Sequence, residues 1–293
     1  MLIKSEQQVA FYLNHISYYR LKGYWWDMQT DKINHIFAPS FSFEDVIVRY
    51  NFDRQLRLIL FDAVECIEIA LRTKLIYHLS QTYGGLWYLN DCLFNDAVLH
   101  IKHINELKAE FARSGENFAK DFRRKHPTES PDPKIWISSE NPDSWIIFEA
   151  ATFGTLSKNY KNIKHQLPQK ALIAHEFGLN STNDLSSWLE SATYLRNAIA
   201  HHSRIWGRNM VKRITLPKNP RNLWLKPTIA LIQGNIQRPK PFLAISTMMY
   251  LCNAINPNND IKNKLLTLFN SNPDIPMYKL GFFTDWQNEP LWQ

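Results

Sequence analysis

Hydrophobic residues along most of this chain recur every three or four positions, the spacing of an amphipathic α-helix. The longest such pattern runs from Ser42 to Tyr83, without proline or glycine, and predicts one long helix or two joined near residues 50–51. No segment alternates strand and helix patterns as a parallel α/β fold would, so the predicted fold class is mainly α. Further helices are predicted at about 5–19, 95–125, 143–161, 167–177, 242–255 and 259–270, and from Leu185 toward Gly207.

Prolines and glycines interrupt this pattern in two places. Four prolines mark 127–142 as a loop between helical segments. After Gly207 prolines become frequent, and the basic segment 209–241 is predicted to be an arm that is irregular or contains a short strand at 211–216. The length of the chain allows one large domain or two of ordinary size.

The net charge of +7 is concentrated in one region of the sequence. Between Glu190 and Asp260 lie ten lysines and arginines and no acidic residue. This local excess, and a pI near 9.2, indicate a polyanionic partner, of which nucleic acid is the commonest kind. Cys66, Cys92 and Cys252 form no CxxC pair, so neither a disulfide framework nor a zinc site is indicated, and we expect no metal or other cofactor.

The chain carries no segment that would direct it to a membrane. The N-terminus has no apolar run of signal-peptide length, and no stretch of about 18 apolar residues is free of charge. Neither terminus resembles a basic amphipathic helix that binds a membrane surface. We therefore expect a reduced, cytoplasmic protein without a membrane partner.

The polar residues of the long helix have two interpretations. They are expected to pair as ions at the surface, since several are three or four positions apart. The alternative is that some of them, notably Arg57 and Glu65, face a functional site. His100 and His103 are also expected at the surface, because no third metal ligand lies near them. The polar residues concerned are Asp53, Arg54, Arg57, Asp62, Glu65, Glu68 and Arg72.

An aromatic segment, 18–26, follows the first predicted helix. Gly23 is predicted to end that helix, since glycine is common at helix C-termini. The aromatic side chains that follow are expected to pack in the core. The alternative is a surface that stacks nucleic-acid bases beside Arg20 and Lys22.

The densest candidate chemistry lies in residues 194–208, which contain Arg196, Asn197, His201 and His202. Five residues turn a helix by about 500°, so Arg196 and His201 lie about 140° apart and do not share a face. They can meet at one phosphate if the helix lines a cleft or if a second copy of the chain faces it. Asn197 and His201 are four apart and share a face, so Asn197 can hold the imidazole in one tautomer.

These residue types suffice for RNA cleavage without a metal. One group takes the proton of the ribose 2′-OH, another protonates the leaving 5′-oxygen, and a cation stabilises the phosphate. Histidine can fill either proton role, and arginine binds phosphate through two donors. The alternative is that both histidines are merely exposed or cap a helix. Nearby basic residues that suit contacts with phosphate are Arg204, Arg208, Lys212, Arg213, Lys218 and Arg221, whereas Trp206 and Trp224 are expected to pack in the core.

Four segments, in order along the chain, resemble signatures of the Abi family of bacterial abortive-infection proteins. Residues 195–208 resemble its LRNxxAHHxRLWNR signature, and 18–24 resemble its YYRLxGY signature. Residues 52–73 are similar to its long-helix signature, and 281–286 to its C-terminal GFPxxW. Gly207 stands where the family often has asparagine, a departure at the edge of the signature.

The resemblance implies a single Abi-like α-helical domain over 1–293, with a HEPN-like helical bundle whose core is built from about 43–84 and 143–208. In HEPN proteins an arginine and a histidine with four to six residues between them form a metal-independent ribonuclease site, usually across a dimer. The catalytic residues that this implies here are Arg196, Asn197 and His201, with His202 at the looser spacing.

The resemblance also implies phage defence through toxicity, a homodimer, and a structured noncoding RNA as partner, with no DNA partner. The first hypothesis is therefore a metal-independent endoribonuclease toxin that cleaves RNA by attack of the 2′-OH. The alternative is a non-catalytic RNA-binding component of a phage-defence ribonucleoprotein. A third and weaker hypothesis is a protein–protein sensor of phage components, for which the basic region is incidental.

Overall fold

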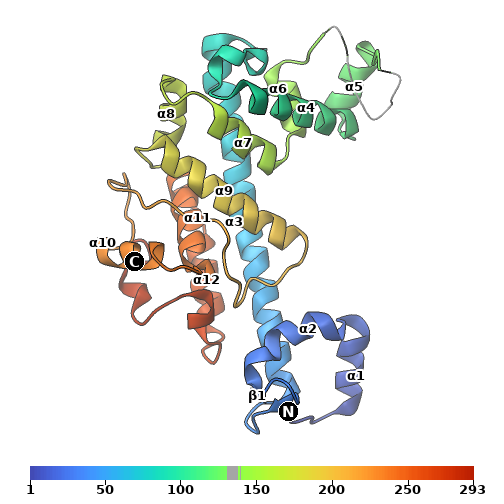
Figure 1. The fold of residues 1–293 in the computed structure, drawn as a ribbon, viewed down its shortest axis with the longest axis vertical. Helices are drawn as coiled ribbons and strands as arrows, with labels where there is room; N and C mark the ends of the chain where they lie inside the picture. Colours follow the sequence, from blue (N-terminus) through green and yellow to red (C-terminus); the bar gives the residue numbers. More distant parts are fainter. Residues whose placement is uncertain (131–137, 139) are drawn as a thin grey trace.

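One helix runs through most of the length of the molecule (Figure 1). This helix, α3 (Phe43–Tyr83), has 41 residues and confirms the predicted long helix as a single element. Ser42 and Asp45 form a capping box at its start, in which the Asp45 carboxylate accepts a hydrogen bond from the Ser42 backbone N–H at 2.7 Å. Gly84, with φ of +78°, ends it. The computed structural model describes residues 1–130, 138 and 140–293.

The described part of the chain contains twelve α-helices and one small sheet, which confirms the mainly α class. The sheet is an antiparallel pair, β1 (Gln29–Asp31) and β2 (Ile36–Phe37). The other α-helices are α1 (Glu6–His15), α2 (Tyr18–Trp25), α4 (Ala97–Arg113), α5 (Asn117–Lys125), α6 (Ser144–Ile147), α7 (Phe153–Asn162), α8 (Pro168–Glu176), α9 (Thr182–Ala200), α10 (Pro227–Gly234), α11 (Pro241–Ile255) and α12 (Ile261–Asn270). Short 3-10 turns lie at Trp26–Met28, Trp87–Leu89, Asp91–Leu93, Phe148–Ala150, Met277–Leu280 and Trp286–Asn288.

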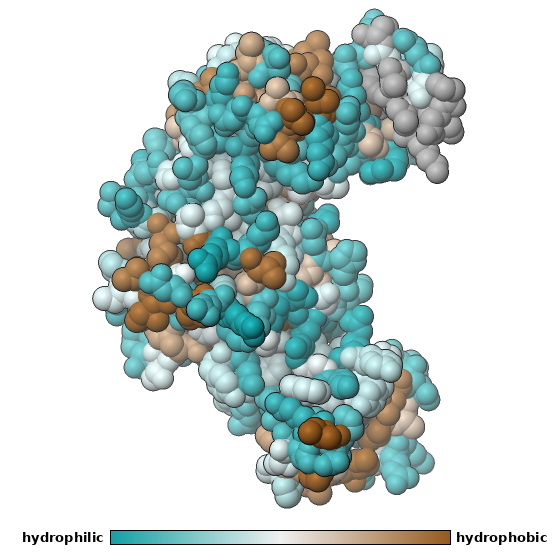
Figure 2. All heavy atoms as spheres, in the orientation of Figure 1, coloured by the Kyte–Doolittle hydropathy of each residue, from teal (hydrophilic) through white to brown (hydrophobic). Residues whose placement is uncertain are grey.

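The helices surround α3 in three groups along its length (Figure 1). α1 and α2 lie at its N-terminal end, α9, α11 and α12 beside its middle, and α4 to α8 toward its C-terminal end. Because helices pack against α3 from several sides, its buried residues form a wide face rather than a narrow stripe. Hydrophilic residues cover most of the face seen in Figure 2, and hydrophobic ones appear there in separate patches. None of the described helices combines the length and hydrophobicity that a transmembrane span requires.

The N-terminal segment differs from the prediction of one helix over 5–19 that ends at Gly23. α1 ends at His15, the chain turns at Ser17, and α2 continues through Gly23. Gly23 does not end the helix but allows a close contact with Arg204. A Cβ at this position would lie 3.3 Å from the Arg204 guanidinium. The glycine therefore lets the loop that follows α9 approach the backbone of α2.

Two predicted helices are each divided in the structure. The segment 95–125 forms α4 and α5, separated at Ser114-Gly115, and 143–161 forms α6 and α7. His100 and His103 are buried on the inner face of α4, which corrects their predicted surface position. The His100 ring stacks on Phe94 at 4.0 Å between centroids, so burial of the flat aromatic ring accounts for its place.

The segment 209–241 forms an irregular arm, with α10 as its only helix among the described residues and no strand at 211–216. Of the predicted loop 127–142, residues 131–137 and 139 lie outside the described residues. The aromatic tail packs inward, because the rings of Phe282, Trp286 and Trp292 are buried against one another.

Candidate functional site

Helix α9 ends at Ala200, seven residues before the predicted end at Gly207. A Schellman turn stops it: the His202 N–H donates to the Ile199 carbonyl at 2.8 Å, and the Ser203 N–H to the Ala198 carbonyl at 2.8 Å. His202 adopts the left-handed conformation that this turn requires, with φ of +53°. The helix therefore carries Arg196 and Asn197, whereas both histidines lie on the turn after it.

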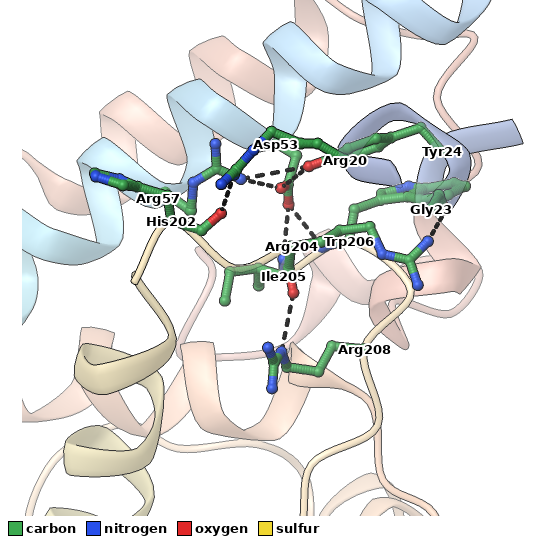
Figure 3. Close-up of polar contacts among 10 residues, drawn as sticks. All are labelled: Arg20, Gly23, Tyr24, Asp53, Arg57, His202, Arg204, Ile205, Trp206 and Arg208. Atoms are coloured by element: carbon green, nitrogen blue, oxygen red, sulfur yellow. Dashed lines mark hydrogen bonds and ion pairs between the residues drawn. The ribbon is translucent and has the colours of Figure 1, made fainter. Parts of the chain in front are cut away.

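Asp53 holds the chain that follows this turn (Figure 3). Its Oδ1 accepts hydrogen bonds from the backbone N–H groups of Ile205 at 3.0 Å and Trp206 at 2.7 Å. Its Oδ2 accepts from the Tyr24 hydroxyl at 2.6 Å and from the Arg57 guanidinium. Asp53 is completely buried, so its predicted role in a surface ion pair is wrong. The pairing with Arg57 exists, but α2, α3 and the loop enclose it.

Burial affects the acid–base properties of this cluster. It raises the pKa of the Asp53 carboxyl, and the hydrogen bonds from Tyr24 and the backbone, together with Arg57, oppose the shift. Burial and the nearby Asp53 carboxyl raise the pKa of the Tyr24 hydroxyl. Tyr24 therefore stays protonated near neutral pH, and its hydroxyl donates a hydrogen bond to Asp53. The cluster acts as a structural anchor, because all four of its donors are directed at one carboxylate.

Two arginines, one on α2 and one on the loop after the turn, link the turn to helix α2 by hydrogen bonds. Arg20 donates to the His202 carbonyl at 2.7 Å, and Arg204 donates to the Gly23 carbonyl (Figure 3). The Arg204 guanidinium also lies over the Tyr24 ring, 5.8 Å from its centroid. Arg208 donates to the Arg204 carbonyl at 2.9 Å. These contacts leave three guanidinium groups beside the two histidines.

A pocket opens where α2 meets the turn, and we call it the histidine pocket. Its volume is about 580 Å³. Its lining contains no acidic residue, and both His201 and His202 are exposed to solvent. No carboxylate in the lining therefore neutralises the positive charge of its arginines. The lining residues are Ser17, Tyr19, Arg20, Gly23, Tyr24, His201, His202, Ser203, Arg204 and Arg208.

Arg196 and Asn197 line a different pocket, of about 500 Å³, together with Glu106, Glu110 and Lys158 among others. Arg196 donates to the Asn197 side-chain oxygen at 3.5 Å. The five-residue spacing turns Arg196 about 140° from position 201 around the helix axis. Within the described residues, no hydrogen bond joins the Asn197 side chain to the ring of His201.

The family model described as Abi-like protein matches residues 11–207. The chain belongs to this family. The matched region contains α2 and the turn after α9, which line the histidine pocket, and of the lining residues Arg208 alone lies beyond the match. No curated protein and no solved structure matches the chain. Membership in the Abi-like family implies a role in abortive infection, a form of phage defence.

The basic residues predicted to bind RNA divide into two sets in this Abi-like chain. Arg204 and Arg208 line the histidine pocket. Lys212, Arg213, Lys218 and Arg221 are exposed on the irregular arm, beyond the region that the family model matches. Trp206 and Trp224 are buried, as predicted.

The sequence places Arg20 only beside an alternative base-stacking surface and predicts Asp53 in a surface ion pair, so it assigns neither residue to the site around 194–208. Arg20 lies within the 18–24 signature, and Asp53 within the 52–73 signature, so the family resemblance held the signal for both. Arg57 is near the turn, as the alternative interpretation expected, because it lines a pocket with His202. Glu65 is exposed and does not line that pocket.

Proposed function

We propose that the protein is an abortive-infection endoribonuclease that cleaves RNA without a metal, by attack of the ribose 2′-OH on the adjacent phosphorus. The observation that carries this proposal is the composition of the histidine pocket. Two exposed histidines and three arginines line it without a carboxylate. An RNA phosphate would meet cations there and no repelling charge.

Each component of the reaction has a candidate in this pocket. His201 takes or gives the proton, because imidazole serves as both acid and base near neutral pH. His202 is the candidate for the second proton transfer. Its backbone is held by the Schellman turn and by Arg20, which limits its movement. Arg20 and Arg208 supply charge to stabilise the phosphate as negative charge builds up.

The position of Arg196 supports a homodimer in this proposal. Arg196 and Asn197 line a pocket apart from the histidines, so one chain does not bring the RNxxxH residues to one point. A second copy that faces α9 would place Arg196 of the partner subunit near His201. We further propose that a structured noncoding RNA controls the enzyme and that the exposed basic arm, 209–241, binds it.

The test is cleavage of an unstructured RNA by the purified protein in EDTA. We expect products that end in a 2′,3′-cyclic phosphate, and a rate that falls about 10²–10⁴-fold in His201→Ala. Arg196→Ala should lose activity as well. His175→Ala is the matched control, because His175 is also exposed but lies on α8. Full activity in His201→Ala, or cleavage that requires a metal, would overturn the proposal.

The second candidate function is a non-catalytic RNA-binding component of a phage-defence ribonucleoprotein. The separation of Arg196 from the histidines favours it if the protein is a monomer. This candidate predicts RNA binding that weakens steeply with salt, and no cleavage in EDTA. The cleavage assay in EDTA separates the two candidates, and light scattering reports whether a dimer forms that can bring Arg196 of the partner subunit to His201.

A further inference from the structure

A second pocket adjoins the histidine pocket on the other side of Gly23, and we call it the lysine pocket. Its volume is about 500 Å³. It shares Tyr19, Gly23 and Arg204 with the histidine pocket, so the two form one continuous concave surface along α2. The lysine pocket is lined by Tyr19, Lys22, Gly23, Trp26, Asp27, Arg204, Trp206, Gly207, Lys240 and Lys279.

Two aromatic rings on this surface are exposed, contrary to the core packing expected for segment 18–26. Tyr19 is 84% exposed and Trp26 is 45% exposed, whereas Tyr24 and Trp25 are buried as expected. Exposure of two large rings beside one pocket is unfavourable unless something covers them. The rings therefore offer flat apolar faces to a ligand.

The Tyr19 ring has an aromatic neighbour, and the Trp26 ring has cations beside it. Tyr18 contacts Tyr19 edge to face at 5.6 Å and packs on the buried Trp25 at 5.2 Å. The ammonium groups of Lys22 and Lys32 lie 5.7 Å and 5.5 Å from the centre of the Trp26 ring. This combination of aromatic platforms and lysines is the composition of surfaces that bind single-stranded nucleic acid.

Positive charge dominates the combined wall of both pockets. Six lysines and arginines line it, against one carboxylate, that of Asp27. Asp27 is already paired with Arg49 at 2.9 Å and with Lys279 at 3.3 Å. Burial, together with the charges of Lys279 and Arg204, lowers the pKa of Lys240. A bound phosphate would relieve this repulsion between cations.

We propose that the two pockets form one track for single-stranded RNA, in which Tyr19 and Trp26 stack on unpaired bases. Lys22, Lys240 and Lys279 contact the phosphates, and the track leads the strand to His201. The inference deepens the proposed function, on which it rests, by naming the substrate class as RNA that is unpaired beside the cleaved bond. A duplex would not fit this role, because its base faces are already stacked.

The test measures binding without cleavage, in the His201→Ala background, by fluorescence anisotropy at fixed salt. Three ligands of equal length are compared: a short unstructured RNA, the same RNA paired with its complement, and a strand of abasic nucleotides. The abasic strand keeps the phosphates and removes the bases, so it separates stacking from charge. We expect the single strand to bind at least about tenfold more tightly than either of the others.

Aromatic variants then locate the effect on the track. Tyr19→Ala and Trp26→Ala should each weaken binding of the single strand about tenfold and leave binding of the abasic strand unchanged. Trp26→Phe keeps a ring and should retain most of the affinity. Tyr77→Ala is the matched control, because Tyr77 is 55% exposed but lies near the far end of α3.

The inference is overturned if Tyr19→Ala and Trp26→Ala bind the single strand as tightly as the parent, or if the duplex or abasic strand binds equally well. This failure is distinct from failure of the proposed function. If cleavage depends on His201 but neither aromatic variant changes binding, the RNA track is refuted and the proposed ribonuclease stands. If there is no cleavage but both aromatic variants weaken binding, the proposed ribonuclease is refuted and the track stands as a binding surface for single-stranded RNA.

Discussion

Replacement of Asp53 by asparagine preserves the shape of the side chain and removes its charge. In the native structure Oδ2 accepts from the Tyr24 hydroxyl and from Arg57, and Oδ1 accepts from the backbone N–H groups of Ile205 and Trp206. Asparagine can still accept from the two backbone groups through its one oxygen. Its NH₂ group then faces two donors, Tyr24 and Arg57, in a buried place.

The expected cost is about 3–5 kcal/mol, the usual effect of removing one partner from a buried ion pair. Asp53 is 0% exposed and Arg57 is 6% exposed, so solvent does not screen the loss. Total stabilities of proteins are about 5–15 kcal/mol, so Asp53→Asn should remove a large part of the stability of this one. The loop bearing Ile205 and Trp206 should also loosen, which would displace His201 and lower RNA cleavage.

The assay is urea unfolding followed by circular dichroism, for Asp53→Asn, Arg57→Met and the double variant. The double variant should be more stable than the sum of the single effects by about 1–3 kcal/mol, because it leaves no unpaired buried charge. Arg54→Met is the control, since Arg54 lies on the same helix but is exposed. Additive effects, or a loss below about 1 kcal/mol in Asp53→Asn, would refute the anchor.

Two further predictions concern other parts of the chain. His202→Gly should be more stable than His202→Ala by about 1 kcal/mol in thermal unfolding, because φ is +53° at this position; the opposite order would contradict the left-handed turn. Burial lowers the pKa of Lys170 to about 8, from 10.5. Between these two pH values only the unfolded chain keeps the proton, so the wild type should gain up to about 3 kcal/mol relative to Lys170→Met as pH rises from 8 to 10.5. Below about pH 8 the difference should be constant, and a decrease with rising pH in urea unfolding would show that the assigned burial effect is wrong.

Local features of the sequence were sufficient to find most helices. α3, α8, α11 and α12 lie close to their predicted positions, because hydrophobic spacing and caps such as Ser42 act within one or two turns. Signals for interruption were harder to interpret: Gly23 lies inside α2, whereas the turn at His202 ends α9 without a glycine. Both residues have partners far away in the chain, because the Arg204 guanidinium lies against Gly23 and Arg20 donates to the His202 carbonyl.

The sequence by itself determined the helical class, the family resemblance and the candidate residues Arg196, Asn197, His201 and His202. Only the tertiary structure decided which of them share a pocket and what surrounds them. Spacing along one helix reports the faces of that helix, but it cannot report which face a neighbouring helix covers. Spacing therefore predicts Asp53 on a polar surface, although α2 and the loop after α9 bury it. The histidine pocket likewise depends on tertiary structure. Arg20 on α2 and Arg204 on that loop are 184 positions apart in the sequence, yet both line it.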